Sequence, residues 1–412
     1  MLYGYCMNLG LVLTGGGARA AYQVGVIQAI ADFSSKRESP FNIITGVSAG
    51  AINGSYLMSR ANDFKTAAKG LSDLWLNLHS DKIYKTDTRS LASLGTKWLG
   101  ILGTGGIYSN KEKINYLLDT RPLRKLLEEE LRLEQLPQFF NTGILRGVSV
   151  SATNYLTGTA ISFYDGIEEL NPWIRSTRIG VQTQLSVEHI MASSAIPIFF
   201  PPVNINGKYY GDGCIRLSSP LSPAIHLGAD RVIAVGIRTS RSNEEIIKFN
   251  QELSKGDLTI AEISGMLLNA VFLDSLETDI ERMERINSTL SMMSLENLSQ
   301  MTSKLRQIPL LALNPSRNLG ELAIGILHEF PAMIRFLLKG LGAKENKGWD
   351  LLSYLAFEKA YTHQLIELGY SDTLRKKNTI LEFLNGELKK VKTERLNGFM
   401  KLEKENGNDL SN

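Results

Sequence analysis

Short apolar runs alternate with stretches of helical periodicity through the first half of the chain. For example, Val24, Ile27 and Ile30 recur at the spacing of one helix face. The apolar runs predict strands at 9–14, 42–46, 147–153, 159–164 and 231–238, and the periodic stretches predict helices at 19–33 and 49–58. Strands that alternate with helices predict an α/β fold, in which a mainly parallel central sheet is covered by helices.

The second half, from about residue 240, is largely helical in pattern. Residues 258–290 predict one long amphipathic helix, 308–313 a further strand, and 350–384 more helix. Residues 319–341 are apolar but contain Pro331 and several glycines, so they suit a buried or interfacial helix better than a spanning one. Packing in the core is the preferred interpretation of this segment, and contact with a membrane surface is the alternative.

Two segments show no clean periodicity or a strongly polar one. Residues 79–110 are apolar and glycine-rich, which predicts a packed connection or, as the alternative, a mobile lid over an apolar pocket. The tail at 386–412 is rich in Lys and Glu, and we expect a solvated helix that frays into disorder.

Composition narrows the class of protein. Of the 412 residues, 43% are hydrophobic and 21% charged, as in a packed globular protein, and the net charge of +3 is too small to indicate a nucleic-acid partner. Cys6 and Cys214 form no metal-ligand pattern, so neither a disulfide framework nor a metal is expected. Without a secretory signal or an apolar run of roughly 18 residues, a cytoplasmic location is expected, with peripheral membrane contact or export by dedicated machinery left open.

The pentapeptide Gly46-Val47-Ser48-Ala49-Gly50 carries the strongest chemical signal. It follows a predicted strand and opens a predicted helix, which is the setting of a nucleophile elbow. The glycines allow a sharp turn with the serine at its apex, and the helix N-terminus adds hydrogen-bond donors near a developing oxyanion.

A second glycine-rich turn, Gly15-Gly16-Gly17, lies between a predicted strand and helix. Its backbone N–H groups can bind an anion, either the oxyanion of acyl transfer or a nucleotide phosphate. The dinucleotide pattern G-x-G-x-x-G is not met, because alanine occupies its last position in either register, and the P-loop pattern is absent. Arg19 either fixes this loop at the start of the helix or attracts a substrate phosphate.

A serine nucleophile needs a base. Of the histidines, His226 lies in a predicted short helix and is expected to pack there, and His328 and His363 lie in the appended half. The alternative is Asp212 in Tyr210-Gly211-Asp212-Gly213, which the flanking glycines predict to stand on a tight, exposed turn.

Taken together, these features resemble the patatin-like phospholipase family. The matching stretches are GGGARAAYQVGV, ITGVSAGAINGSYL, SSAIPIFFPPV and YYGDGCIRLSSPLSPAIHLGAD, within residues 9–237. The resemblance implies a patatin-like α/β domain over 8–240 and, more weakly, a mostly helical C-terminal extension over 241–385. Two departures affect local geometry only: Ala20 stands where the family often has Gly, and Cys214 where it often has Gly or Ala.

The resemblance also implies a mechanism without a cofactor. Ser48 corresponds to the nucleophile and Asp212 to its base, while Gly15, Gly16 and Gly17 form the oxyanion loop beside Arg19. The expected activity is serine-dependent hydrolysis of carboxylic esters of lipids, of the phospholipase A or lysophospholipase type. A soluble carboxylesterase and a binding protein that retains the fold are the alternatives, and the oligomeric state stays open.

Overall fold

The computed structural model describes residues 7–86, 116–239, 243–251, 257–294 and 305–387. Residues 87–115 and 388–412 lie outside this part of the chain, and with them most of the expected connection at 79–110 and nearly all of the expected charged tail.

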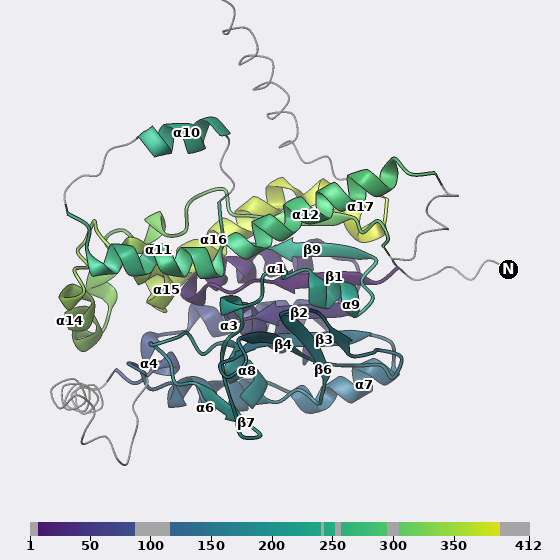
Figure 1. Ribbon diagram of the computed structural model, residues 1–412, viewed down its shortest axis with the longest axis horizontal. Helices are drawn as coiled ribbons and strands as arrows, with labels where there is room; N and C mark the ends of the chain where they lie inside the picture. The colour runs from purple at the N-terminus through teal and green to yellow at the C-terminus, as the bar shows by residue number, and fades with distance from the viewer. Residues whose placement is uncertain (1–6, 87–115, 240–242, 252–256, 295–304, 388–412) are drawn as a thin grey trace, which may run out of the picture.

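A mixed, mostly parallel sheet forms the centre of the described structure (Figure 1). Its main path runs β10-β9-β1-β2-β3-β4-β6-β5, with β7 and β8 joined to it through β3. The pairs from β10 through to β3 are all parallel, and β3 pairs antiparallel with β4. The strands are β1 (Leu9–Leu13), β2 (Ile43–Val47), β3 (Gly147–Asn154), β4 (Thr159–Gly166), β5 (Trp173–Ile174), β6 (Arg178–Gln182), β7 (Val203–Ile205), β8 (Lys208–Asp212), β9 (Arg231–Val235) and β10 (Leu310–Leu313).

Helices cover both faces of this sheet. Those of the first half are α1 (Ala21–Phe33), α2 (Ala49–Met58), α3 (Phe64–Leu76), α4 (Ser80–Ile83), α6 (Arg121–Glu130), α7 (Leu136–Asn141), α8 (Val187–Ser193) and α9 (Ser222–His226). Those of the second half are α11 (Ile260–Phe272), α12 (Asp274–Ser291), α14 (Ala332–Gly340), α15 (Trp349–Leu355), α16 (Lys359–Arg375) and α17 (Lys377–Asn385), while α10 (Asn243–Gln251) stands apart from the sheet in Figure 1. Short 3-10 turns are η1 (Gly17–Ala20), η2 (Leu133–Gln135), η3 (Gly213–Ile215), η4 (Glu321–Ala323) and η5 (Ile326–Glu329).

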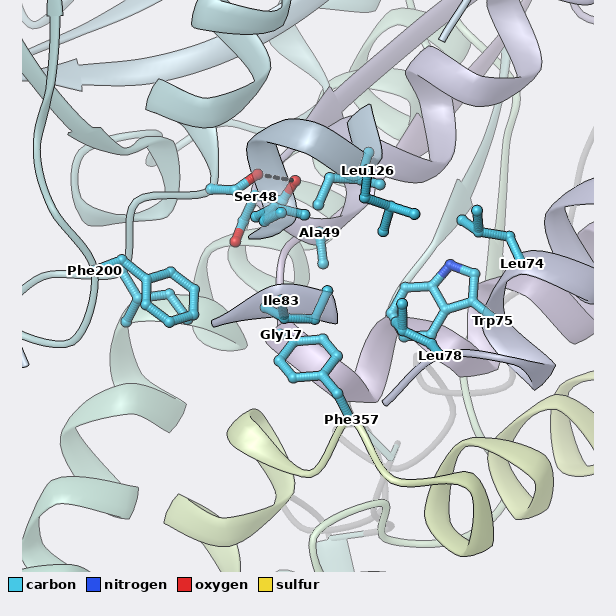
Figure 2. Close-up of a pocket in the computed structure, with 14 residues that line it drawn as sticks. Gly17, Ser48, Ala49, Leu74, Trp75, Leu78, Ile83, Leu126, Phe200 and Phe357 are labelled. Carbon is cyan, nitrogen blue, oxygen red and sulfur yellow. Dashed lines mark hydrogen bonds between the residues drawn. The ribbon is translucent and has the colours of Figure 1, made fainter. Parts of the chain in front are cut away.

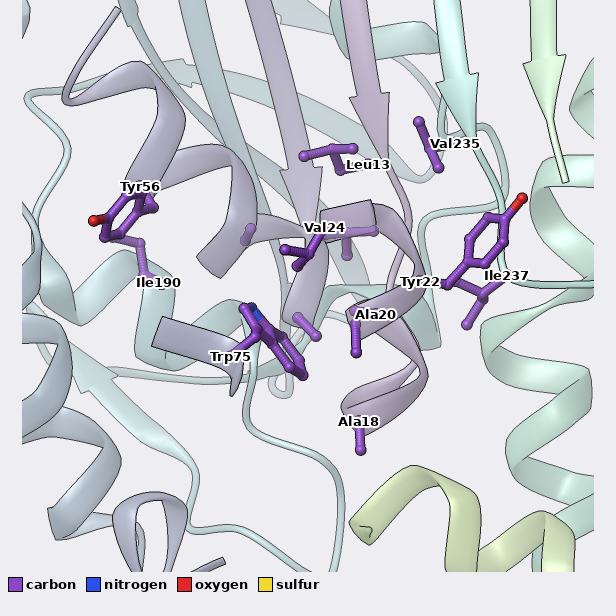
Figure 3. Packing of buried hydrophobic residues seen from close by; sticks show 14 of the residues in the cluster. Leu13, Ala18, Ala20, Tyr22, Val24, Tyr56, Trp75, Ile190, Val235 and Ile237 are labelled. Carbon is purple, nitrogen blue, oxygen red and sulfur yellow. The ribbon is translucent and has the colours of Figure 1, made fainter. Parts of the chain in front are cut away.

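The expected α/β class is confirmed, and the apolar runs explain it. In β1, Leu11 and Leu13 enter the larger core, whereas Val12 points to the smaller core on the other face. Figure 3 shows Leu13 of β1 and Val235 of β9 above Val24 of α1, in the same apolar cluster. β1 is buried on both faces, and this explains why its sequence is apolar throughout.

The C-terminal half belongs to the same packed body. β10 pairs in parallel with β9 and so extends the sheet, as predicted for 308–313. α16 packs along the whole of α1, where Gly25 and Gly369 let the two backbones approach: a Cβ at Gly25 would lie 2.0 Å from the carbonyl oxygen of Ile366. α16 and α17 of the extension are therefore part of the covering of the sheet.

The expectation of a single helix over 258–290 is wrong. The helix breaks at Leu273 into α11 and α12. The two parts have different surfaces to reach, because Phe272 at the end of α11 contacts the loop at Gly15, whereas Leu276 and Ile280 of α12 pack against the sheet. One straight helix could not meet both surfaces.

The apolar segment 319–341 forms η4, η5 and α14 instead of one helix, and Pro331 precedes α14. Ile326, Phe330 and Ile334 are buried, as the preferred interpretation expected, but Phe336 and Leu337 are exposed. In the part of the chain that the structure describes, no helix is both long and apolar enough to cross a bilayer.

Candidate active site

Strand β3 brings Ser48 and Asp212 together. β2 runs parallel to β3 and ends with Val47 opposite Ser151, so that Ser48 is the next residue. β8 pairs antiparallel with the continuation of the same edge and ends with Asp212 opposite Ala152. The two strands thus meet end to end along β3, and the residues expected as nucleophile and base lie at the junction.

Ser48 adopts a backbone conformation that is rare for a residue with a side chain, with φ +55° and ψ −130°. Such a conformation costs on the order of 1–3 kcal/mol and is held only where the surroundings fix it. Here the neighbouring glycines permit it: a Cβ at Gly46 would lie 2.4 Å from the carbonyl oxygen of Gly50, and one at Gly50 would lie 2.3 Å from that of Leu13. With α2 starting at Ala49, the strand-turn-helix arrangement is that of a nucleophile elbow.

The Ser48 hydroxyl donates a hydrogen bond of 2.5 Å to Oδ2 of Asp212. Oδ1 of Asp212 accepts the backbone N–H of Cys214 at 2.9 Å, so both carboxyl oxygens are held. The expectation of an exposed turn at Asp212 is wrong, because this residue ends β8 and is completely buried. The glycines beside it serve close packing: a Cβ at Gly213 would lie 2.2 Å from the carbonyl oxygen of Ser151.

Burial sets the protonation behaviour of this pair. It raises the pKa of Asp212 to about 7, against the opposite effect of the hydrogen bonds from Ser48 and Cys214. A carboxylate with a pKa near 7 is a much better base than an exposed one and is still substantially ionised at neutral pH. Burial also raises the pKa of the Cys214 thiol, so that Cys214 is a protonated packing residue, as expected.

Two serines at the C-terminal end of α8 hold the elbow, and sequence reasoning assigned them no role. The backbone N–H of Ser48 donates to the hydroxyl of Ser193 at 2.9 Å, and that hydroxyl donates to the carbonyl of Ser151 at 2.6 Å. The hydroxyl of Ser194 donates to the carbonyl of Ser48 at 3.2 Å. Both serines lie in the matching stretch SSAIPIFFPPV, which was the available signal, but only their position beside β3 reveals what they do.

The glycine loop lies against the dyad. A Cβ at Gly15 would lie 2.6 Å from that of Ser48 and 2.4 Å from Sγ of Cys214, so only glycine fits between them. Gly17 has φ +56°, and a Cβ there would lie 2.2 Å from the carbonyl oxygen of Tyr354. The expected oxyanion loop is therefore close to Ser48, and the C-terminal extension packs on its other side.

Arg19 is buried and turned toward that extension. Its guanidinium donates to Asp350 at 2.7 Å, to Ser353 at 2.8 Å and to Asn269 at 3.0 Å, and it lies 4.2 Å from the ring centre of Tyr354. Of the two expected roles of Arg19, these contacts favour the structural one, because they bury the side chain to 2% exposure against the extension.

The histidines have other surroundings. His226 stacks on Trp173 with ring centres 4.7 Å apart, and burial lowers its pKa to about 4. His189 completes the capping box of α8 with Ser186. All five histidines belong to the described residues, and none has a hydrogen bond to Ser48 or Asp212 there.

An apolar pocket opens at Ser48 (Figure 2). Its space, open solvent included, amounts to about 480 Å³ between the first-half helices and the extension. Its side chains are apolar except for two serines, Ser48 and Ser194, and Phe357 closes one wall from the segment between α15 and α16. The lining residues are Gly17, Ser48, Ala49, Ile52, Leu74, Trp75, Leu78, Ile83, Leu123, Leu126, Ser194, Ile196, Phe200 and Phe357. Within the described ranges, no group of three or more His, Cys, Asp or Glu side chains is placed to hold a metal ion.

The sequence model of the family described as patatin-like phospholipase matches residues 11–225, which is more than half of the chain. The chain belongs to the patatin-like phospholipase family. The match includes the glycine loop, the serine elbow and Asp212, and membership supports lipid ester hydrolysis as the class of activity. No relative among the curated proteins matches the sequence.

Solved structures of similar proteins share little sequence with this patatin-like chain. VipD from Legionella pneumophila is 14% identical, with 88% of this chain and 67% of VipD covered and a TM-score of 0.31. Human GIVD cytosolic phospholipase A2, solved with methyl gamma-linolenyl fluorophosphonate, is 12% identical, with 93% and 59% covered and a TM-score of 0.41. Full-length ExoU of Pseudomonas aeruginosa, in complex with SpcU, is 13% identical, with 92% and 80% covered and a TM-score of 0.25. The chain spans about three fifths of the length of the human phospholipase structure.

Proposed function

We propose that this protein is a serine acyl hydrolase that cleaves carboxylic esters of lipids, of the phospholipase A or lysophospholipase type. The observation that carries the proposal is the 2.5 Å hydrogen bond between Ser48 and a completely buried Asp212, at the mouth of an apolar pocket. Burial of a carboxylate costs folding free energy. The hydroxyl and the carboxylate, hydrogen-bonded to each other, have the geometry of a nucleophile and its base.

The proposed reaction has two halves. Asp212 takes the proton of Ser48 as Oγ attacks the ester carbonyl, and backbone N–H groups of the Gly15–Gly17 loop stabilise the oxyanion. The tetrahedral intermediate expels the alcohol or lysolipid, which receives the proton from Asp212, and leaves an acyl ester on Ser48. Asp212 then takes a proton from water as that water attacks the acyl ester, and Ser48 regains its proton when the fatty acid leaves.

The lining of the pocket supports an acyl chain as the group that is bound. Burial of each methylene is worth about 0.8 kcal/mol, so an apolar pocket of this kind gains affinity with every carbon of the chain. Burial of the carboxyl group itself raises the pKa of Asp212, which does not line the pocket, to about 7.

A carboxylesterase that acts on monomeric esters is the second candidate. The observation in its favour is that none of the fourteen residues that line the pocket is charged, so the pocket itself offers no partner for a phosphate group. A non-enzymatic binding protein gains no support from an aspartate buried against a serine, because that arrangement costs stability without a reaction to serve.

The direct test is a lipid panel read by mass spectrometry. Phospholipids, lysophospholipids, triacylglycerols and short p-nitrophenyl esters are incubated with the full chain, with Ser48→Ala and with Asp212→Asn. We expect fatty-acid release from the lipids, and a loss of at least about 10³-fold in both variants. The matched control is Ser291→Ala at the exposed end of α12, which should keep full activity. Full activity in Ser48→Ala would reject the dyad, and hydrolysis of short esters alone would favour the carboxylesterase.

A further inference from the structure

Helix α11 carries apolar side chains on its inner side and on its outer side. Its inner side buries Ala261, Gly265 and Phe272. Its outer side leaves four large apolar side chains in contact with solvent: Ile260 (61% exposed), Ile263 (45%), Met266 (57%) and Leu267 (57%). A helix that is hydrophobic all round is normally buried on all sides, in a protein core or in a membrane. The outer face of α11 is therefore exposed to solvent, although such an apolar helix face is normally buried.

Within α11 itself, the four exposed positions of this face carry no charge. Glu262, which is the one charged residue of α11, folds back onto the helix start, where it forms a capping box with Thr259. The next helix gives an internal comparison, because α12 presents Glu281, Arg282 and Arg285 on its solvent side. The same stretch of chain thus contains one ordinary surface helix and one whose solvent side is made of apolar residues.

The neighbouring segment adds exposed apolar and basic groups. The start of α11 is joined to the end of α14 by a hydrogen bond from the N–H of Ala261 to the carbonyl of Leu341 at 2.9 Å, and Figure 1 shows the two helices at the same end of the molecule. In α14, Phe336 is 67% exposed. Residues 332–348 contain four basic side chains and one acidic side chain, Glu345. The basic side chains are Arg335, Lys339, Lys344 and Lys347.

The inner side of α11 reaches the active-site loop. Phe272 contacts Gly15, and a Cβ at Gly15 would lie 3.2 Å from its ring. Asn269 accepts hydrogen bonds from Arg19 at 3.0 Å and from Tyr354 at 2.9 Å. The uncovered face is thus on the far side of a helix that itself packs against the glycine loop.

We propose that the outer face of α11, together with Phe336 of α14, docks on a lipid surface that carries anionic headgroups. Large apolar side chains with lysines beside them are what an interfacial helix uses: the apolar groups enter the boundary of the bilayer, and the lysines meet phosphate and carboxylate groups. The reason for docking rests on the proposed function, since a lipid hydrolase must reach its substrate in an aggregate, but the binding itself does not depend on catalysis.

The test separates binding from hydrolysis. Flotation is measured for full-length Ser48→Ala protein with vesicles of phosphatidylcholine alone and with phosphatidylglycerol added. We expect flotation that increases with phosphatidylglycerol and decreases with salt. In the same background, Ile263→Glu combined with Met266→Glu should weaken binding about tenfold or more, because two charges replace two membrane-facing apolar groups. Lys339→Glu combined with Lys344→Glu should mainly remove the dependence on phosphatidylglycerol.

A matched control introduces two glutamates elsewhere. Thr278→Glu combined with Leu374→Glu changes exposed positions of α12 and α16 and should leave flotation unchanged. In otherwise wild-type protein, the α11 variant should still hydrolyse a short soluble ester within about twofold of wild type, while hydrolysis of vesicle lipid falls with binding. Unchanged flotation of the α11 variant would overturn the proposal. It would also be overturned if light scattering showed self-association and the same variant abolished it. The outer face of α11 would then be buried against a second copy of the protein.

Discussion

The guanidinium of Arg19 lies 2.7 Å from the carboxylate of Asp350, although 331 positions separate the two residues in the sequence. Arg19 follows the glycine loop by two positions, and Asp350 is near the start of α15 in the extension. Because the Arg19 side chain is 2% exposed, its positive charge is stabilised by these protein partners and not by water. This ion pair joins the loop that the proposed mechanism uses to a part of the chain that the family match does not include.

Replacement of Arg19 should therefore cost both stability and activity. Arg19→Ala leaves Asp350 without its cation and Ser353 and Asn269 without a donor, and we expect a loss of about 3 kcal/mol in the free energy of unfolding. The measurement is urea denaturation followed by circular dichroism. Arg37→Ala is the control, because its ion pair with Asp63 is exposed and should be worth less than about 1 kcal/mol. Equal losses in the two variants would contradict the structural role of Arg19.

The activity should depend on pH through Asp212. Its pKa is raised to about 7, mainly by burial, and only the ionised form can accept the serine proton. We expect kcat/KM for a short p-nitrophenyl ester to rise about tenfold per pH unit below 7 and to level off above it. The rate at which a fluorophosphonate labels Ser48 should follow the same curve. A flat profile from pH 5 to pH 8 would contradict the assignment of Asp212 as the base.

Removal of the buried charge should stabilise the protein at high pH. The unfolded aspartate has a pKa of about 3.9 and the folded one a pKa of about 7, so between these values the folded state holds a proton that the unfolded state has lost. The stability of the wild type therefore falls as pH rises from about 4 to about 7. Asp212→Asn does not titrate, and its free energy of unfolding minus that of the wild type should be about 1–3 kcal/mol larger at pH 8 than at pH 4. A difference that is the same at both pH values would show that the carboxyl group is not perturbed.

The contact between Gly17 and the extension predicts a second way to damage the site. Gly17→Ala places a Cβ 2.2 Å from the carbonyl oxygen of Tyr354 and also strains a backbone with φ +56°. Gly143→Ala is the matched control, since Gly143 has φ +76° with open space around it and suffers only the backbone cost of roughly 1–2 kcal/mol. Thermal unfolding should show a larger loss for Gly17→Ala, and hydrolysis should be lost in that variant alone. Similar effects in both variants would exclude the contact with Tyr354 as the cause.

The pocket should discriminate between acyl chains by size. Leu126→Phe narrows it from α6, so hydrolysis of long-chain esters should fall about tenfold while that of acetyl esters stays within about twofold. The ratio of kcat/KM values across a series of p-nitrophenyl esters measures this selectivity. Leu322→Phe, which enlarges a half-buried leucine in the extension away from the pocket lining, is the control and should leave the ratio unchanged. A uniform loss over the whole series would mean that the acyl chain binds elsewhere.

The patterns in the sequence predicted the local features of this structure, but not how distant elements pack against one another. The elbow at Ser48 was predictable because strand, turn and helix are encoded by adjacent residues. The burial of Asp212 was not, because it arises from the pairing of β8 with the far end of β3, some sixty positions earlier in the chain. The break at Leu273 was missed for the same reason: periodicity shows which residues are apolar, but not that the loop at Gly15 and the sheet lie in different directions.

The wall that Phe357 adds to the pocket has a consequence for the order in which the protein matures. A chain emerges from the ribosome with its N-terminal part first, so Ser48 and Asp212 are present long before α15 and Phe357 are made. Until then, Arg19 has no counter-ion and the acyl pocket is open on one side. On the proposed mechanism, a nascent chain that ends before α15 is therefore expected to lack hydrolytic activity, although it already contains Ser48 and Asp212.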